Sequence, residues 1–83
     1  MEIWYTYIVE CSDKTLYVGT TNDIEKRLIK HNAGKGAKYT RGRAPVKIRY
    51  SEVFESRAEA CKHEYKLKRY SREQKLELIE LGH

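Results

Sequence analysis

The segment WYTYIVE at residues 4–10 is the part of the chain from which the fold follows. Its aromatic and β-branched residues favour a β-strand. The segment LYV at residues 16–18 has the same character, and residues 12–14, SDK, carry side chains typical of a turn. The two segments predict a β-hairpin, and we expect Gly19 to break the second strand at its end.

Side chains alternate between the two faces of a strand, so the hairpin loop decides which residues share a face. With an odd number of loop residues, Tyr5, Tyr7 and Val9 lie on the same face as Tyr17. We therefore expect the side chains of Tyr7 and Tyr17 to converge on one side of the sheet.

A first helix is expected over residues 23–32. Asn22 and Glu25 have the three-residue spacing of a capping box, which marks a helix N-terminus. Ile24 and Leu28 lie one turn apart, and we expect this apolar stripe to face the sheet.

Arg27 and His31 lie one turn apart on the same predicted helix and border its apolar stripe. This position would hold both side chains at the edge of the sheet instead of in open solvent. The pair is therefore suited to a functional site.

Two further capping boxes predict two helices in the C-terminal part of the chain. In the first of these helices, Ala58, Cys61 and Tyr65 form the apolar stripe expected to pack on the sheet, with Glu64 beside it. The boxes are Ser56 with Glu59 and Ser71 with Gln74, and the helices are expected over residues 57–69 and 72–81.

Between the first and second helices we expect a loop and a third strand. Residues 34–45 form a basic loop that contains glycine, and residues 46–54 alternate apolar and polar side chains, which predicts a strand with one wet face. The element order is then ββαβαα. This order predicts an α+β fold, a small three-stranded antiparallel sheet flanked by helices.

Length and composition predict one domain over residues 1–83, because a chain this short buries only about 60 % of its unfolded surface in a single core. No apolar run reaches the roughly 18 residues of a membrane span. Cys11 and Cys61 lack the spacing of a metal site or a disulfide framework. We expect a cytoplasmic protein with no membrane partner.

The charge is concentrated in the middle of the chain. Residues 26–49 contain nine Lys and Arg and no Asp or Glu, while the whole chain has a net charge of +5. This asymmetry favours a polyanionic partner such as nucleic acid over a basic face that serves solubility alone. The candidate nucleic-acid-binding residues are Lys30, Lys35, Lys38, Tyr39, Arg41 and Arg43.

Hydrolysis of a phosphodiester requires an activated water and cations that offset charge on phosphorus. Glu64 could hold Mg²⁺, which binds proteins through one or two carboxylates and keeps several waters. Arg27 offers a bidentate fork to phosphate. Tyr7, Tyr17 and His31 can transfer protons, although an unperturbed tyrosine is only ~0.1 % phenolate at pH 7.

Each of these residues also has an ordinary structural explanation. A strand tyrosine is usually a core residue with its hydroxyl at the rim. A helical arginine four residues from a histidine is usually a surface residue. Glu64 could simply pair with Lys68 one turn later.

Residues 5–7, YTY, and residues 17–19, YVG, resemble the two signature motifs of the GIY-YIG nuclease superfamily. Residues 22–27 and His31 resemble the motif helix of that family, and Glu64 falls where the family carries a metal-binding glutamate. The segment from His31 to Gly42 is similar to the small stand-alone members. The resemblance covers nearly the whole chain and implies the same ββαβαα fold.

The resemblance implies a role for each site residue. Tyr7 would be the general base or its relay, Tyr17 would orient water or phosphate, and Arg27 would clamp the scissile phosphate. His31 would support proton transfer, and Glu64 would hold one Mg²⁺ or Mn²⁺. The implied function is metal-dependent endonuclease activity with low sequence specificity.

The chain departs from the family pattern at three points. The first motif is YTY instead of GIY, Thr20 stands where repair-type members often have lysine, and the last helix has no asparagine matching the one near the site in several members. A non-catalytic DNA- or RNA-binding module is therefore an alternative, and an interaction protein with an aromatic hairpin is another. The oligomeric state stays open.

The segment GKGAK at residues 34–38 is not a nucleotide-binding loop. It follows a predicted helix and lacks the GxxxxGK[ST] spacing of such loops. We therefore expect no nucleotide hydrolysis.

Overall fold

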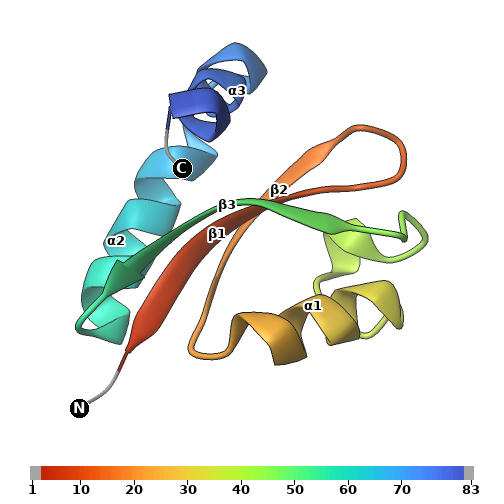
Figure 1. Cartoon of the computed structure of the whole chain (residues 1–83), viewed down its shortest axis with the longest axis horizontal. Coiled ribbons are helices and arrows are strands. Elements are labelled where there is room, and N and C mark those ends of the chain that lie inside the picture. The colour runs from red at the N-terminus through yellow and green to blue at the C-terminus, as the bar shows by residue number, and fades with distance from the viewer. Residues whose placement is uncertain (1–2, 82–83) are drawn as a thin grey trace.

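The computed structural model describes residues 3–81 and has the element order ββαβαα, which confirms the expected α+β fold (Figure 1). A short 3-10 helix, η1, adds one turn to the basic loop. The elements are β1 (Trp4–Glu10), β2 (Leu16–Thr21), α1 (Ile24–Asn32), η1 (Lys38–Thr40), β3 (Lys47–Phe54), α2 (Arg57–Lys68) and α3 (Arg72–Leu81).

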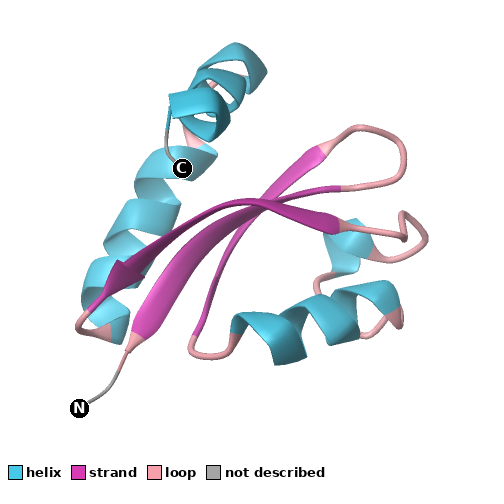
Figure 2. Ribbon diagram, viewed as in Figure 1, coloured by secondary structure: helices cyan, strands magenta, loops and turns pink. Residues whose placement is uncertain are grey.

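The three strands form one antiparallel sheet with β1 in the centre, in the order β2-β1-β3 (Figure 2). In the hairpin, Val9 pairs with Tyr17 and Tyr7 pairs with Gly19. This register places Tyr7 and Tyr17 on the same face, which confirms the prediction from the loop length.

The expected strand break at Gly19 is wrong. β2 continues through Gly19 to Thr21. A Cβ atom at Gly19 would collide with the phenol group of Tyr7 on the neighbouring strand. Gly19 is thus needed because the Tyr7 side chain approaches its backbone closely. Such close approach, and not only a strand end, is a reason for glycine to stand within a strand.

The alternation in the third strand predicted that one of its faces would be wet, and this prediction is wrong. The register between β1 and β3 shifts between Ile8 and Val9, so that Ile8 lies opposite Tyr50 and Val9 lies opposite Ile48. The extra residue at this bulge turns Ile48 and Tyr50 to opposite faces of the sheet. Both faces therefore receive apolar side chains from this strand.

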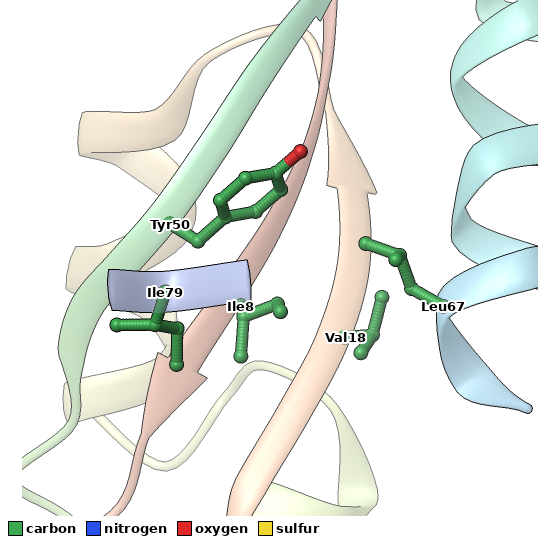
Figure 3. Packing of buried hydrophobic residues seen from close by; sticks show 5 residues of the cluster. All are labelled: Ile8, Val18, Tyr50, Leu67 and Ile79. Atoms are coloured by element: carbon green, nitrogen blue, oxygen red, sulfur yellow. The ribbon is translucent and has the colours of Figure 1, made fainter. Parts of the chain in front are cut away.

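Two hydrophobic clusters cover the two faces of the sheet. Helix α1 packs on one face, and α2 and α3 pack on the other (Figure 1). The first cluster, shown in Figure 3, comprises Ile8, Val18, Tyr50, Leu67 and Ile79. The second comprises Tyr7, Val9, Cys11 and Val46, with Tyr17, Leu28 and Ile48 packed against them.

Helix α2 faces the sheet with a different side from the one expected. Ala58, Cys61 and Tyr65 are exposed, whereas Ala60 and Leu67 are buried. The hydroxyl of Thr6 on β1 donates a 2.6 Å hydrogen bond to the carbonyl oxygen of Ala60. This rotation brings Glu64, midway between Ala60 and Leu67, to the side of α2 that meets the sheet.

The helix caps agree with the sequence in two cases out of three. The side chains of Ser56 and Ser71 accept hydrogen bonds from the backbone N–H groups of Glu59 and Gln74, as predicted. Helix α1 begins one residue later than expected, because its cap is Asp23 and not Asn22. Among residues 3–81, no helix combines the length and apolar composition of a membrane span.

Candidate active site

The hydroxyl of Tyr7 is held by two side chains of helix α1. It lies 2.9 Å from Nε2 of His31, and Nε of Arg27 donates to it over 3.3 Å. Tyr7 and His31 are both almost completely buried, and Arg27 is half-buried. His31 therefore lies deeper than the sheet edge at which the sequence placed it, and the three predicted residues form one contiguous group.

The bonds of His31 define its tautomer. Its Nδ1 lies 2.7 Å from the hydroxyl of Thr40, and that hydroxyl donates its proton to the carbonyl oxygen of Ala37 over 3.0 Å. Thr40 can then only accept from His31, so Nδ1 carries a proton. In the neutral ring Nε2 is therefore the acceptor, and Tyr7 donates its hydroxyl proton to it.

Electrostatics keep this pair uncharged near neutral pH. Burial raises the pKa of Tyr7, and the neighbouring Arg27 offsets only part of that effect. Burial, followed by the positive charge of Arg27, lowers the pKa of His31. The ground state is thus a neutral phenol bonded to a neutral imidazole, with a guanidinium beside the phenol oxygen.

Two glycines make room for this pair. Gly19 lies against the Tyr7 hydroxyl, and a Cβ atom at Gly36 would collide with the His31 ring. Neither glycine has a positive φ at which only glycine would fit. Space, and not backbone conformation, requires glycine at both positions.

Tyr17 extends the group toward the surface. Its ring meets the His31 ring edge-on at 5.5 Å between centroids, and it stacks on the Tyr39 ring at 5.8 Å. The guanidinium of Arg43 lies 4.6 Å from the centre of the Tyr39 ring. A continuous series of rings therefore leads from the buried histidine to the exposed Tyr39.

Glu64 approaches the same strand edge from the other face of the sheet. Its carboxylate accepts a hydrogen bond from the Thr20 hydroxyl of β2 and lies 2.8 Å from Nζ of Lys68. Nζ of Lys68 is in turn 5.9 Å from the centre of the Tyr17 ring. The candidate site thus wraps around the free edge of β2, with Tyr7 and Tyr17 on one face and Glu64 on the other.

Glu64 is the candidate metal ligand of the site. Among residues 3–81, no group of three or more His, Cys, Asp or Glu side chains could enclose a metal ion. Mg²⁺ does not need such a cluster, since it binds through one or two carboxylates and keeps its waters. The ammonium of Lys68 already occupies this carboxylate, so a divalent cation would have to displace it.

The predicted nucleic-acid-binding residues lie mostly on the surface. Lys30, Lys35, Lys38 and Arg41 are exposed, and Tyr39 is 44 % exposed. The sixth, Arg43, is different, because its Nη1 pairs with Asp13 at 2.7 Å. It is therefore the member of the set whose charge is already partly neutralised.

A family model described as the GIY-YIG catalytic domain matches residues 3–77 of the chain. The chain belongs to the GIY-YIG family. The matched region includes all six elements from β1 to α2 and most of α3.

Relatives of similar length share this sequence closely. A UPF0213 protein of Staphylococcus saprophyticus is 54 % identical over 99 % of this chain and all of its own. A UPF0213 protein of Haloquadratum walsbyi is also 54 % identical, over 94 % of this chain and 88 % of its own. The similarity to this chain therefore covers nearly the whole of these small proteins.

Two solution NMR structures are similar to the GIY-YIG fold described here. The UPF0213 protein of Bacillus halodurans has a TM-score of 0.61 and 46 % identity, covering 95 % of this chain and 84 % of its own. A protein of E. faecalis has a TM-score of 0.62 and 42 % identity, covering 100 % and 92 %.

The candidate site also contains two residues that the sequence did not single out. Thr40 fixes the His31 tautomer, and Gly36 makes room for the His31 ring. The pair of Glu64 with Lys68, expected from their spacing as the ordinary structural explanation of Glu64, is present in the structure. Nothing in the local sequence connects Thr40 with His31, because the loop conformation alone brings them together.

Proposed function

We propose that this protein is a metal-dependent endonuclease of low sequence specificity that hydrolyses phosphodiester bonds, most readily in DNA. The observation that carries the proposal is the Tyr7 hydroxyl, bonded both to the acceptor nitrogen of His31 and to Arg27. A tyrosine that served only as packing would not need a buried base and a cation on the same oxygen.

The Tyr7–His31 bond supports a proton relay. As water attacks phosphorus, it gives a proton to Oη of Tyr7, which passes its own proton to Nε2 of His31. No standing phenolate is needed, so the raised pKa of Tyr7 is compatible with the reaction. Because Tyr7 is 1 % exposed, it acts behind Tyr17, which is half-buried at the edge of β2 and orients the water.

Arg27 and Glu64 supply the remaining functions. Nε of Arg27 donates to Tyr7, and the terminal nitrogens of the guanidinium would hold the scissile phosphate. Glu64 would hold one Mg²⁺ or Mn²⁺ beside Thr20, and the metal would offset charge on the phosphate and the leaving oxygen. The leaving oxygen takes up a proton from solvent water, and His31 returns its proton to solvent through Tyr7 after the products leave, which restores the neutral pair.

One observation favours the alternative, a non-catalytic module that binds nucleic acid. Both carboxylate oxygens of Glu64 are engaged, one by Thr20 and one by Lys68. A metal must displace Lys68 to bind there. If that exchange does not take place, the chain keeps its basic surface without activity.

The test is a gel assay on supercoiled, single-stranded and branched DNA and on RNA, at low salt, with Mg²⁺ or Mn²⁺ against EDTA. We expect wild type to nick DNA only with metal. Tyr7→Phe should lower the rate about 100-fold or more, since general acid–base groups contribute 10²- to 10⁴-fold. Glu64→Ala should abolish cleavage.

A matched variant separates chemistry from folding. Lys62→Ala changes an exposed side chain of α2 and should keep full activity. Circular dichroism of every variant checks that the fold is retained. If wild type binds every substrate but cleaves none, the endonuclease proposal is overturned in favour of the binding module. If wild type shows no binding and no cleavage, both proposals are overturned.

A further inference from the structure

A pocket next to the candidate active site is not used by the proposed chemistry. It has a volume of about 270 Å³ and is lined by Thr15 and Leu16 of the hairpin, Tyr39 of η1, and Arg72 and Lys75 of α3. It therefore lies where three segments far apart in the sequence meet.

The pocket joins the active site through one aromatic contact. Tyr39 stacks on Tyr17 at 5.8 Å between centroids, and Tyr17 packs against His31. A molecule in the pocket would thus share a wall with the residue that we propose orients the attacking water.

The lining combines two kinds of surface. Leu16 and the 44 % exposed ring of Tyr39 are apolar and aromatic, and the Thr15 hydroxyl adds a polar group. Both charged residues of the lining, Arg72 and Lys75, are cations. A flat aromatic ligand that carries negative charge matches this combination, and an unpaired nucleotide has both parts.

The walls of the pocket are fixed in place. Nη1 of Arg72 donates to the carbonyl oxygen of Lys14 at 2.7 Å, which ties α3 to the hairpin loop. Asp13, the acidic residue of that loop, is paired with Arg43 at 2.7 Å and accepts from the Thr15 hydroxyl. The one carboxylate of the loop is therefore neutralised, and the local charge stays positive.

We propose that this pocket binds the base of an unpaired nucleotide next to the scissile phosphate. The base packs between Leu16 and Tyr39, and Arg72 and Lys75 hold its phosphate. A base inside a duplex is stacked on both faces and cannot enter, so the pocket selects single-stranded or gapped nucleic acid. This inference rests on the proposed function, because it names the substrate form of the same site.

The experiment uses oligonucleotides with one unpaired 2-aminopurine, whose fluorescence falls when it stacks on an aromatic ring. The protein is the full chain, and EDTA prevents cleavage during the titration. We expect binding to quench the probe. An abasic residue at the same position should weaken binding by wild type roughly 5- to 150-fold, the range typical of one stacked base.

Variants then assign the effect to the pocket. Tyr39→Leu should remove most of the quenching and should make binding indifferent to the abasic residue, whereas Tyr39→Phe should behave as wild type. Lys75→Ala should weaken binding while keeping the quenching, and Lys62→Ala on α2 should change neither. If Tyr39→Leu fails to fold, Leu16→Lys tests the same wall of the pocket, with the same expected loss of quenching.

Two failures can be told apart. Binding that is equally tight with a base or an abasic residue, and equally tight to duplex, would overturn this inference and leave the proposed function intact. Absence of binding to any nucleic acid would overturn the proposed function as well. Quenching that persists in Tyr39→Leu would mean that the base stacks on another aromatic ring, and it would also overturn the proposal that the base binds in this pocket.

Discussion

At the scale of single residues, Gly19 decides whether the Tyr7 hydroxyl can reach His31. A Cβ atom at Gly19 would collide with that phenol group. We expect Gly19→Ala to displace Tyr7, to lower the free energy of unfolding by about 1–3 kcal/mol, as overpacking of a core does, and to abolish cleavage. Urea unfolding and the nicking assay measure the two effects.

Gly42→Ala is the matched control for Gly19→Ala. Gly42 has a φ of 79°, and a Cβ atom there would have nothing within 4 Å. This variant should lose about 1 kcal/mol from backbone strain and keep its activity, because the added Cβ atom contacts neither Tyr7 nor His31. Equal losses of activity in the two variants would contradict the role of Gly19.

The protonation state of His31 predicts how stability depends on pH. Burial and Arg27 hold the pKa of His31 below its ordinary value of about 6.5, so the unfolded chain binds this proton more readily than the folded protein. The stability associated with neutral His31 is therefore complete above about pH 6.5 and is lost as the pH falls through the folded pKa, by at most about 1.4 kcal/mol per pH unit.

His31→Gln removes this titration. Urea unfolding at pH 7.5 and 5.5 should show a smaller loss of stability on acidification in the variant than in wild type. The pKa of His63 is also lowered by burial, and this second histidine remains in both proteins. The difference between the two proteins therefore isolates His31, and identical pH dependence would contradict the neutral pair.

At the scale of elements, the sequence predicted the three strands and the three α-helices, but neither η1 nor every packing face. The capping pairs at Ser56 and Ser71 marked two helices, because capping is local chemistry. The predicted packing face of α2 was wrong, because the apolar residues of this helix are spread around it and tertiary contacts decide which side packs on the sheet. The β1–β3 register shift was missed because a bulge adds one residue without a local signal.

The orientation of α2 predicts opposite effects for two of its large side chains. Leu67 is completely buried in the cluster on the α2 face, whereas Tyr65 is 70 % exposed. Leu67→Ala should lower the free energy of unfolding by about 2–5 kcal/mol. Tyr65→Ala should stay within about 0.5 kcal/mol of wild type. Urea unfolding compares them, and a large loss in Tyr65→Ala would mean that the helix packs with the face first expected.

The Glu64–Lys68 pair on α2 predicts a competition for the carboxylate. Lys68 is 2.8 Å from Glu64, and its side chain is half exposed. Lys68→Met should lower the Mg²⁺ concentration needed for half-maximal cleavage, because the metal no longer displaces an ammonium. Stability should change by less than about 0.5 kcal/mol, as for other helix pairs one turn apart.

Lys62→Met is the control for this prediction, because it removes a charge from the same helix without touching Glu64. Metal titrations of the nicking rate compare the two variants. A higher metal requirement in Lys68→Met would show that the lysine takes part in the reaction instead of opposing the metal.

At the scale of the whole molecule, the candidate site depends on contacts that no local pattern reveals. Glu64 reaches Thr20 across 44 positions of sequence, and Tyr7 meets His31 across 24. The register of the hairpin predicted that Tyr7 and Tyr17 share a face. The wrapping of the site around the edge of β2 follows only from the packing of α1 and α2 on opposite faces.

The charge distribution of the whole molecule predicts the salt dependence of nucleic-acid binding. The segment of residues 26–49 holds nine Lys and Arg without an acidic residue, and contact with about five phosphates would give a slope of log K against log salt of about −4.5 on duplex DNA. The double variant Lys35→Ala/Lys38→Ala removes two exposed cations and should make the slope shallower by about 2. Fluorescence anisotropy between 50 and about 200 mM salt measures it. The control is the double variant Lys62→Ala/Lys66→Ala on α2, which removes the same charge from the other face of the sheet. It should leave the slope nearly unchanged. An equal change of slope in both double variants would mean that net charge, and not the basic segment, attracts the nucleic acid.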